Sequence, residues 1–163
     1  VHLRPGTYVL YDRCRAPEAH VFEYNLHGME PGSFDPQGQT ATLKMPKASL
    51  EVRFYADQPW QMASFDKADV SPEPNKTRPE RWHFRASSPA KSHAMDLITV
   101  LLPYRTGEQS KLAKTIPLTG ENARGVRFEY PDGRRALVGF AIEPGKPARL
   151  DGVEFTDPVL VRN

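Results

Sequence analysis

The chain has 163 residues, of which 39% are hydrophobic and 26% are charged, and it contains 16 prolines and 11 glycines. Its 22 basic and 20 acidic residues give a formal net charge of +2, which is too balanced for a protein dedicated to nucleic acids. The single cysteine, Cys14, excludes an internal disulfide framework. The many prolines exclude a long-helix protein, because each costs about 3 kcal/mol inside a helix.

The N-terminal part carries two apolar runs with the two-residue period of β-strands. Residues 7–11 are rich in β-forming side chains, and we expect this strand to end at Asp12. Residues 20–26 alternate as well. One face of that strand is expected to carry His20, Phe22, Tyr24 and Leu26.

Three further strands are predicted in the middle of the chain. Residues 50–55 alternate with Leu50, Val52 and Phe54 inward, and residues 82–84 form a shorter candidate. Residues 92–102 also fit helical spacing, but the β-branched run before Pro103 favours a central strand that is buried on both faces. Two segments rich in proline, glycine or charge, residues 28–39 and 66–80, are expected to be loops.

The clearest hairpin lies in the C-terminal part. Residues 126–130 and 136–142 are two apolar runs separated by a turn that contains Asp132 and Gly133, and an Asp-Gly step tolerates the positive φ that such turns need. Residues 153–155 and 159–161 are expected to close the chain as short strands.

Strands about ten residues apart, with turn residues between them, predict an all-β protein. We expect an antiparallel β-sandwich with Pro/Gly-rich loops and little helix. Residues 1–163 are expected to form a single domain, since domains usually span ~100–200 residues. No run of about 18 apolar residues is present, so no membrane-spanning segment is predicted.

The residues alone identify no enzyme. The five histidines lack a tight metal-binding spacing, and there is no GxSxG elbow or phosphate-binding glycine loop. Asp12 and His27 each end a predicted strand, and simple hairpin geometry keeps two such ends apart. Cys14 lies between two arginines but has no identifiable base. An autonomous enzyme would have to use Tyr8 or Tyr11 with His20 or His27 and an arginine.

The order of five short segments is more informative. They are Tyr-Val-Leu-Tyr-Asp-Arg at 8–13, Tyr-Asn-Leu-His-Gly at 24–28, Ala-Ser-Leu-Glu-Val at 48–52, Trp-His-Phe at 82–84 and Leu-Ile-Thr-Val-Leu-Leu-Pro at 97–103. This series resembles the C-terminal β-sandwich region of heparinase II/III-like polysaccharide lyases. The resemblance spans residues 7–143; each segment is loose, and their common order is the stronger signal.

The resemblance implies a two-part bacterial enzyme, periplasmic or secreted, that cleaves acidic polysaccharides by β-elimination. In this family an α-helical toroid precedes the sandwich and supplies most of the catalytic machinery. The chain, which begins at Val1, is then expected to be a C-terminal fragment without catalytic residues and without lyase activity of its own. Its expected partners are the N-terminal α-toroid of the same parent chain and, through the parent, the acidic polysaccharide, with no nucleic acid and no membrane.

The family's sandwich often carries a structural divalent metal bound by two histidines and one aspartate. By position in the motifs, Asp12 matches the aspartate and His27 the second histidine, and the remaining histidine is expected upstream of Val1. Because zinc prefers four donors, with three or four from protein, we expect no cofactor in the fragment. A structural zinc or another divalent metal is expected only in the full-length parent.

Two alternative functions remain open. A carbohydrate-binding module would need an exposed aromatic platform, with Trp60, Trp82 or Tyr104 as candidates, although buried packing is the commoner fate of tryptophan in a sandwich. A purely structural β-sandwich domain would contact no ligand. Four arginines could face sulfates, carboxylates or only water, namely Arg13, Arg15, Arg53 and Arg85.

Overall fold

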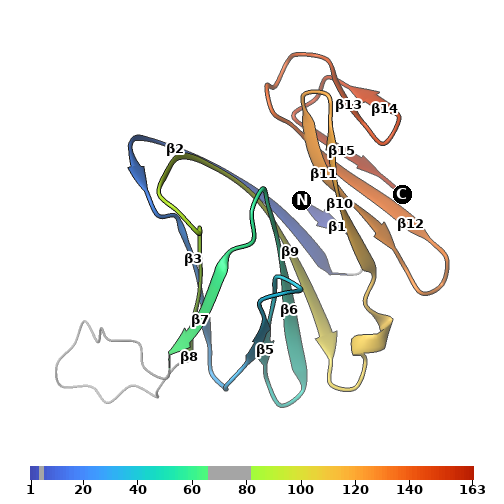
Figure 1. The fold of residues 1–163 in the computed structure, drawn as a ribbon. Helices are drawn as coiled ribbons and strands as arrows, with labels where there is room; N and C mark the ends of the chain where they lie inside the picture. Colours follow the sequence, from blue (N-terminus) through green and yellow to red (C-terminus); the bar gives the residue numbers. More distant parts are fainter. Residues whose placement is uncertain (4–5, 66–81) are drawn as a thin grey trace, which may run out of the picture. The chain divides into compact units, whose positions relative to one another are not determined.

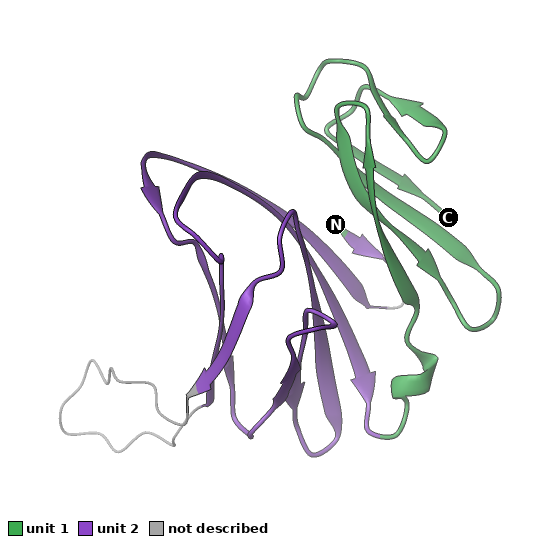
Figure 2. Ribbon diagram, viewed as in Figure 1, with its two compact units in different colours: residues 1, 107–163 green, residues 2–106 purple. Residues whose placement is uncertain are grey.

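The computed structural model describes residues 1–3, 6–65 and 82–163. Two compact units divide the chain (Figure 2): unit 2 comprises residues 2–106, and unit 1 comprises residues 107–163 together with Val1. Each unit is built from antiparallel strands. The prediction that residues 1–163 are one domain of a larger protein stays a prediction.

Unit 2 contains two antiparallel sheets (Figure 1). The larger sheet has the strand order β1-β2-β9-β6-β5-β4. Its strands are β1 His2–Leu3, β2 Thr7–His20, β4 Ser33–Asp35, β5 Thr40–Lys44, β6 Ala48–Ala56 and β9 Ser92–Arg105. The smaller sheet has the order β3-β8-β7. Its strands are β3 Glu23–Gly28, β7 Gln61–Phe65 and β8 Trp82–Ser87.

The two sheets of unit 2 share one apolar core. Its buried members are Ala41, Val52, Phe54, Trp60, Ala86 and Leu97. Partly buried side chains from β3, including Tyr24 and Leu26, pack against this cluster, as does Phe22 just before that strand. The predicted inward face of residues 50–55 is therefore confirmed, and Phe22, Tyr24 and Leu26 share one face as predicted, which turns toward the core. The unit is a β-sandwich.

Strand β9 runs through the middle of the larger sheet, between β2 and β6. Its residues Leu97, Ile98, Thr99 and Val100 are each at most 4% exposed, which confirms the predicted central strand buried on both faces. The strand continues past Pro103, contrary to the expected ending there. Pro103 lies beyond the last residue pair between β9 and β2, Tyr8 with Leu101. Because proline has no N–H to donate, its place beyond that pair means that no hydrogen bond to β2 is lost.

Strand β2 corrects the sequence prediction. It does not end at Asp12 but continues to His20. Pairing with β9 holds it as far as Arg15, opposite Ala94, and resumes at His20, opposite Ser92. Pro17 lies inside the irregular stretch between these two pairs, where the strand need not donate to its neighbour. His20 therefore belongs to β2, and the following strand begins at Glu23.

Unit 1 is a four-stranded sheet of order β10-β11-β12-β15 with a hairpin, β13–β14, packed on it. The strands are β10 Lys114–Gly120, β11 Ala123–Glu129, β12 Arg135–Ala141, β13 Ala148–Leu150, β14 Val153–Phe155 and β15 Val159–Arg162. Its buried core cluster consists of Ala123, Leu137, Ala141, Ala148 and Leu150. A single 3-10 turn, Gln109–Lys111, precedes the sheet.

The predicted hairpin of unit 1 is confirmed. Strands β11 and β12 pair from Glu129–Arg135 to Ala123–Ala141. Gly133 has a φ of 85°, and its N–H donates to the carbonyl of Tyr130 over 2.9 Å. Glycine suits this turn position because a residue without a Cβ adopts a positive φ at little cost.

The two predicted loops have different outcomes. The segment 28–39 contains a short strand, β4, which pairs with β5, so it is not entirely loop. The predicted loop 66–80 lies outside the described residues.

Within the described chain, which is nearly all β, no helix has the length and apolar character needed to cross a membrane.

Candidate functional site

The structure places Asp12 on the face of β2 that points toward the smaller sheet. Asp12 lies opposite Leu97, and directly opposite residues of an antiparallel pair project from the same face. Leu97 is fully buried in the core of the sandwich. The carboxylate of Asp12 is close enough to Tyr24, on β3, to influence the ionisation of its phenol.

His27 lies on the other face of the smaller sheet. Its neighbour in sequence, Leu26, packs into the core, and successive residues of a strand point to opposite sides. His27 pairs with His83 of β8, and the two imidazoles stack with centroids 4.8 Å apart and planes 10° from parallel. A ring nitrogen of His83, Nε2, lies 2.8 Å from Oδ1 of Asn25.

The structure therefore brings His27 together with His83 and Asn25, not with Asp12. Among the described residues, no group of three or more histidine, cysteine, aspartate or glutamate side chains could hold a metal ion. The metal-ligand roles of Asp12 and His27 in a longer parent chain stay a prediction. The contact of His27 with His83 was not predicted, because it depends on the register of two strands far apart in sequence.

Two groups near these positions have shifted ionisation. Partial burial, followed by the electrostatic influence of the neighbouring His27 and Arg85, lowers the pKa of His83, while Glu23 opposes this. On the inner side, burial and then the negative charge of Asp12 raise the pKa of Tyr24 above its ordinary value of 10.0. Both shifts favour the neutral form of the side chain.

Arg13 and Arg15 share one carboxylate on the face of β2 opposite to Asp12. Nε of Arg13 lies 3.3 Å from Oδ1 of Asp96, and Nη2 of Arg15 lies 3.2 Å from both carboxylate oxygens. Arg15 also donates to the carbonyls of Cys14 and Met95. The hydroxyl of Tyr11 donates to the same Asp96 oxygen over 3.4 Å.

The other two predicted arginines are also ion-paired. Arg53 donates from Nε to Oε1 of Glu51 over 2.7 Å, and both side chains are largely buried. Arg85 lies 3.3 Å from Glu23, across the exposed face of the smaller sheet. All four arginines that could bind an acidic polymer thus already contact a carboxylate of the same chain.

Trp60 is buried and does not form part of an exposed aromatic platform. Trp60 is only 5% exposed and belongs to the sandwich core. Its backbone is held by Gln39, which accepts the N–H of Trp60 at Oε1 and donates from Nε2 to the carbonyl. Trp82 and Tyr104 are half-buried.

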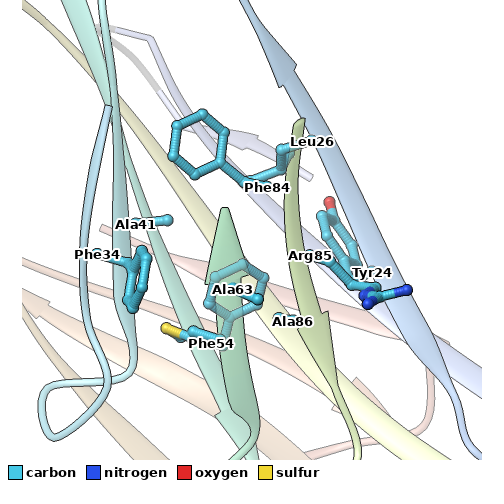
Figure 3. Close-up of a pocket in the computed structure, with 10 residues that line it drawn as sticks. Tyr24, Leu26, Phe34, Ala41, Phe54, Ala63, Phe84, Arg85 and Ala86 are labelled. Atoms are coloured by element: carbon cyan, nitrogen blue, oxygen red, sulfur yellow. The ribbon is translucent and has the colours of Figure 1, made fainter. Parts of the chain in front are cut away.

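A small cavity lies between the two sheets of unit 2 (Figure 3). Tyr24, Phe54 and Phe84 are among its lining residues. Its volume is about 10 Å³, roughly the room of one water molecule. The cavity is therefore a gap in the packing and has no room for a sugar ring.

A much larger hollow lies in unit 1, at the hairpin β13–β14. Its volume is about 610 Å³, within the ~300–1,000 Å³ usual for small-ligand sites. The lining residues are Glu121, Pro147, Ala148, Arg149, Glu154, Phe155 and Thr156. Sequence reasoning missed this hollow, although Asp151 and Gly152, with φ of 50° and 79°, are an Asp-Gly turn that predicts the hairpin beside it.

Comparison with known proteins adds no relative. No protein-family model matches the chain, and no curated protein matches it.

Proposed function

We propose that this chain is the accessory C-terminal β-sandwich of a heparinase II/III-like polysaccharide lyase of bacteria, periplasmic or secreted. One observation supports the proposal: the five segments that carry the resemblance are neighbours in space. Residues 8–13 and 97–103 lie on the adjacent strands β2 and β9. Residues 48–52 begin β6, on the other side of β9, and residues 24–28 pair with 82–84 as β3 and β8.

In this proposal the parent's N-terminal α-toroid performs the β-elimination, and this chain packs beside it and completes a wall of the substrate cleft. The chain contributes no catalytic residue. Three of its four tyrosine and histidine candidates already contact other side chains of the fold: Tyr11 contacts Asp96, His27 stacks on His83 and Tyr8 stacks on His2. The metal site that the resemblance implies, with Asp12, His27 and a histidine from upstream, does not fit the arrangement described above, because Asp12 faces the core and His27 faces outward beside His83.

The isolated chain is expected to have no lyase activity. β-Elimination of a uronic acid polymer creates an unsaturated product that absorbs in the ultraviolet, so the assay measures that absorbance with heparin, heparan sulfate and alginate. The matched control is the longer protein that includes the sequence upstream of Val1, which should be active on at least one polymer and lose activity when residues 1–163 are deleted. Turnover by the isolated chain would refute the proposal.

A further inference from the structure

The hollow of unit 1 presents charged side chains that no neighbour neutralises. Arg149 and Glu154 lie directly opposite each other on β13 and β14, yet the structure records no ion pair between them. Within the described part of the chain, neither these two side chains nor that of Glu121 makes an ion pair or a side-chain hydrogen bond. All three are exposed, and the half-buried ring of Phe155 lies beside them.

The backbone around the hollow is, in contrast, tightly held. The N–H of Arg149 donates to the carbonyl of Glu121 over 2.8 Å. This approach requires Gly120, because a Cβ there would lie 2.0 Å from the carbonyl oxygen of Arg149. Asn122 has a φ of 47°, and its side chain accepts the N–H of Glu143 and donates to the carbonyls of Glu143 and Pro147.

A rigid frame that carries unengaged polar side chains is the arrangement expected of a binding site, since the groups that meet a ligand are positioned in advance. The lining also decides the class of ligand. Two carboxylates and one guanidinium give the hollow a net negative charge, which disfavours a polyanion. Carboxylates accept hydrogen bonds and a guanidinium donates them, so the set suits a neutral molecule with many hydroxyl groups.

We propose that this hollow binds a neutral saccharide. Glu121 and Glu154 accept hydrogen bonds from the sugar hydroxyls, Arg149 donates to hydroxyl or ring oxygens, and the ring of Phe155 packs against the apolar face of a sugar. The site does not depend on the lyase proposal, whose polymer is acidic. Its lining lies outside all five segments that carry the family resemblance.

The experiment titrates the full chain with neutral hexasaccharides of glucose, xylose and mannose, and with a uronic acid hexasaccharide and heparin for comparison. The readouts are backbone amide chemical shifts and calorimetry. We expect a neutral saccharide to shift the amides of residues 121 and 147–156. Arg149→Ala should weaken that binding by about tenfold, the loss of one hydrogen bond to a charged group, and Glu154→Ala should weaken it similarly.

Arg162→Ala is the matched control, because Arg162 is an exposed arginine of the same unit on β15 and does not line the hollow. This substitution should leave binding unchanged, and all variants should keep the melting temperature of the unsubstituted chain. The proposal is overturned if no neutral saccharide shifts these amides at millimolar concentration, if Arg149→Ala leaves the affinity intact, or if only the acidic polymers bind there. None of these outcomes bears on the lyase assay, so the two proposals fail separately.

Discussion

Tyr24 shows how the placement of one residue controls its ionisation. Its phenol is half-buried between the sheets, and the carboxylate of Asp12 lies near it, so burial first and charge second raise its pKa above 10.0. The Thr99 hydroxyl opposes this shift. Burial and the charge of Asp12 outweigh it, so the net shift is upward.

This raised pKa predicts an alkaline loss of stability. As the pH rises above 10.0, the unfolded chain releases the Tyr24 proton before the folded chain does, so the contribution of Tyr24 to stability is complete below that pH and falls above it. Tyr24→Phe should therefore show a shallower alkaline fall in the free energy of unfolding, measured by urea denaturation. The control is Tyr8→Phe, at a tyrosine that is 45% exposed; an equal effect of both changes would contradict the prediction.

Asp12 and His27 give the second prediction at this scale. Their side chains project from different sheets and are not brought together, so the isolated chain should hold much less than one zinc ion per molecule after dialysis. Elemental analysis of the dialysed chain measures this. Stoichiometric zinc in the chain would contradict the prediction.

Among the elements, the pairing of β11 with its neighbours depends on Gly125. A Cβ at this position would lie 2.1 Å from the carbonyl oxygen of Val138 and 2.5 Å from the side chain of Leu150. Because backbone cannot move aside cheaply, Gly125→Ala should cost at least about 3 kcal/mol of stability. The comparison is Gly145→Ala, where a positive φ but no close atom limits the cost to about 1–2 kcal/mol. Denaturant unfolding should rank the two in this order.

The elements that sequence predicted well are those with a strong two-residue period or an unambiguous turn. Leu50, Val52 and Phe54 alternate without a break, and the step at Gly133 marks a hairpin. The elements it missed contain residues that usually end strands. Pro117 lies within β10, which tolerates it because β10 is an edge strand of its sheet, and Pro17 lies in the irregular part of β2.

The contacts of the candidate sites were harder to predict than the strands. Arg13 and Arg15 meet Asp96, and His27 meets His83, only because strands more than 50 residues apart are paired in one particular register. A shift of one residue would move each of these side chains to the other face. Single-sequence patterns indicate which face a residue occupies, but they do not indicate which distant strand lies beside it.

For the molecule as a whole, size predicts how the chain unfolds. Unit 1 consists of residues 107–163 and Val1. A domain of about 60 residues buries only about 60% of the surface of its unfolded chain, so its stability is marginal. Leu150→Ala, at a residue of unit 1 that is 1% exposed, should therefore lower the stability of unit 1 by about 2–5 kcal/mol. Denaturant unfolding measures this, and an unchanged unfolding midpoint would contradict the expectation.

The internal pairing of the arginines has a consequence for any acidic polymer that meets unit 2. A sulfate or uronate that contacts Arg13, Arg15, Arg53 or Arg85 has to exchange with Asp96, Glu51 or Glu23. Those carboxylates are tethered to the same chain, so they compete at a high effective concentration that dilution cannot reduce. Unit 2 would then discriminate among anions by how well each replaces a carboxylate beside an arginine. Most of the affinity for an acidic polymer would have to come from groups other than these four arginines.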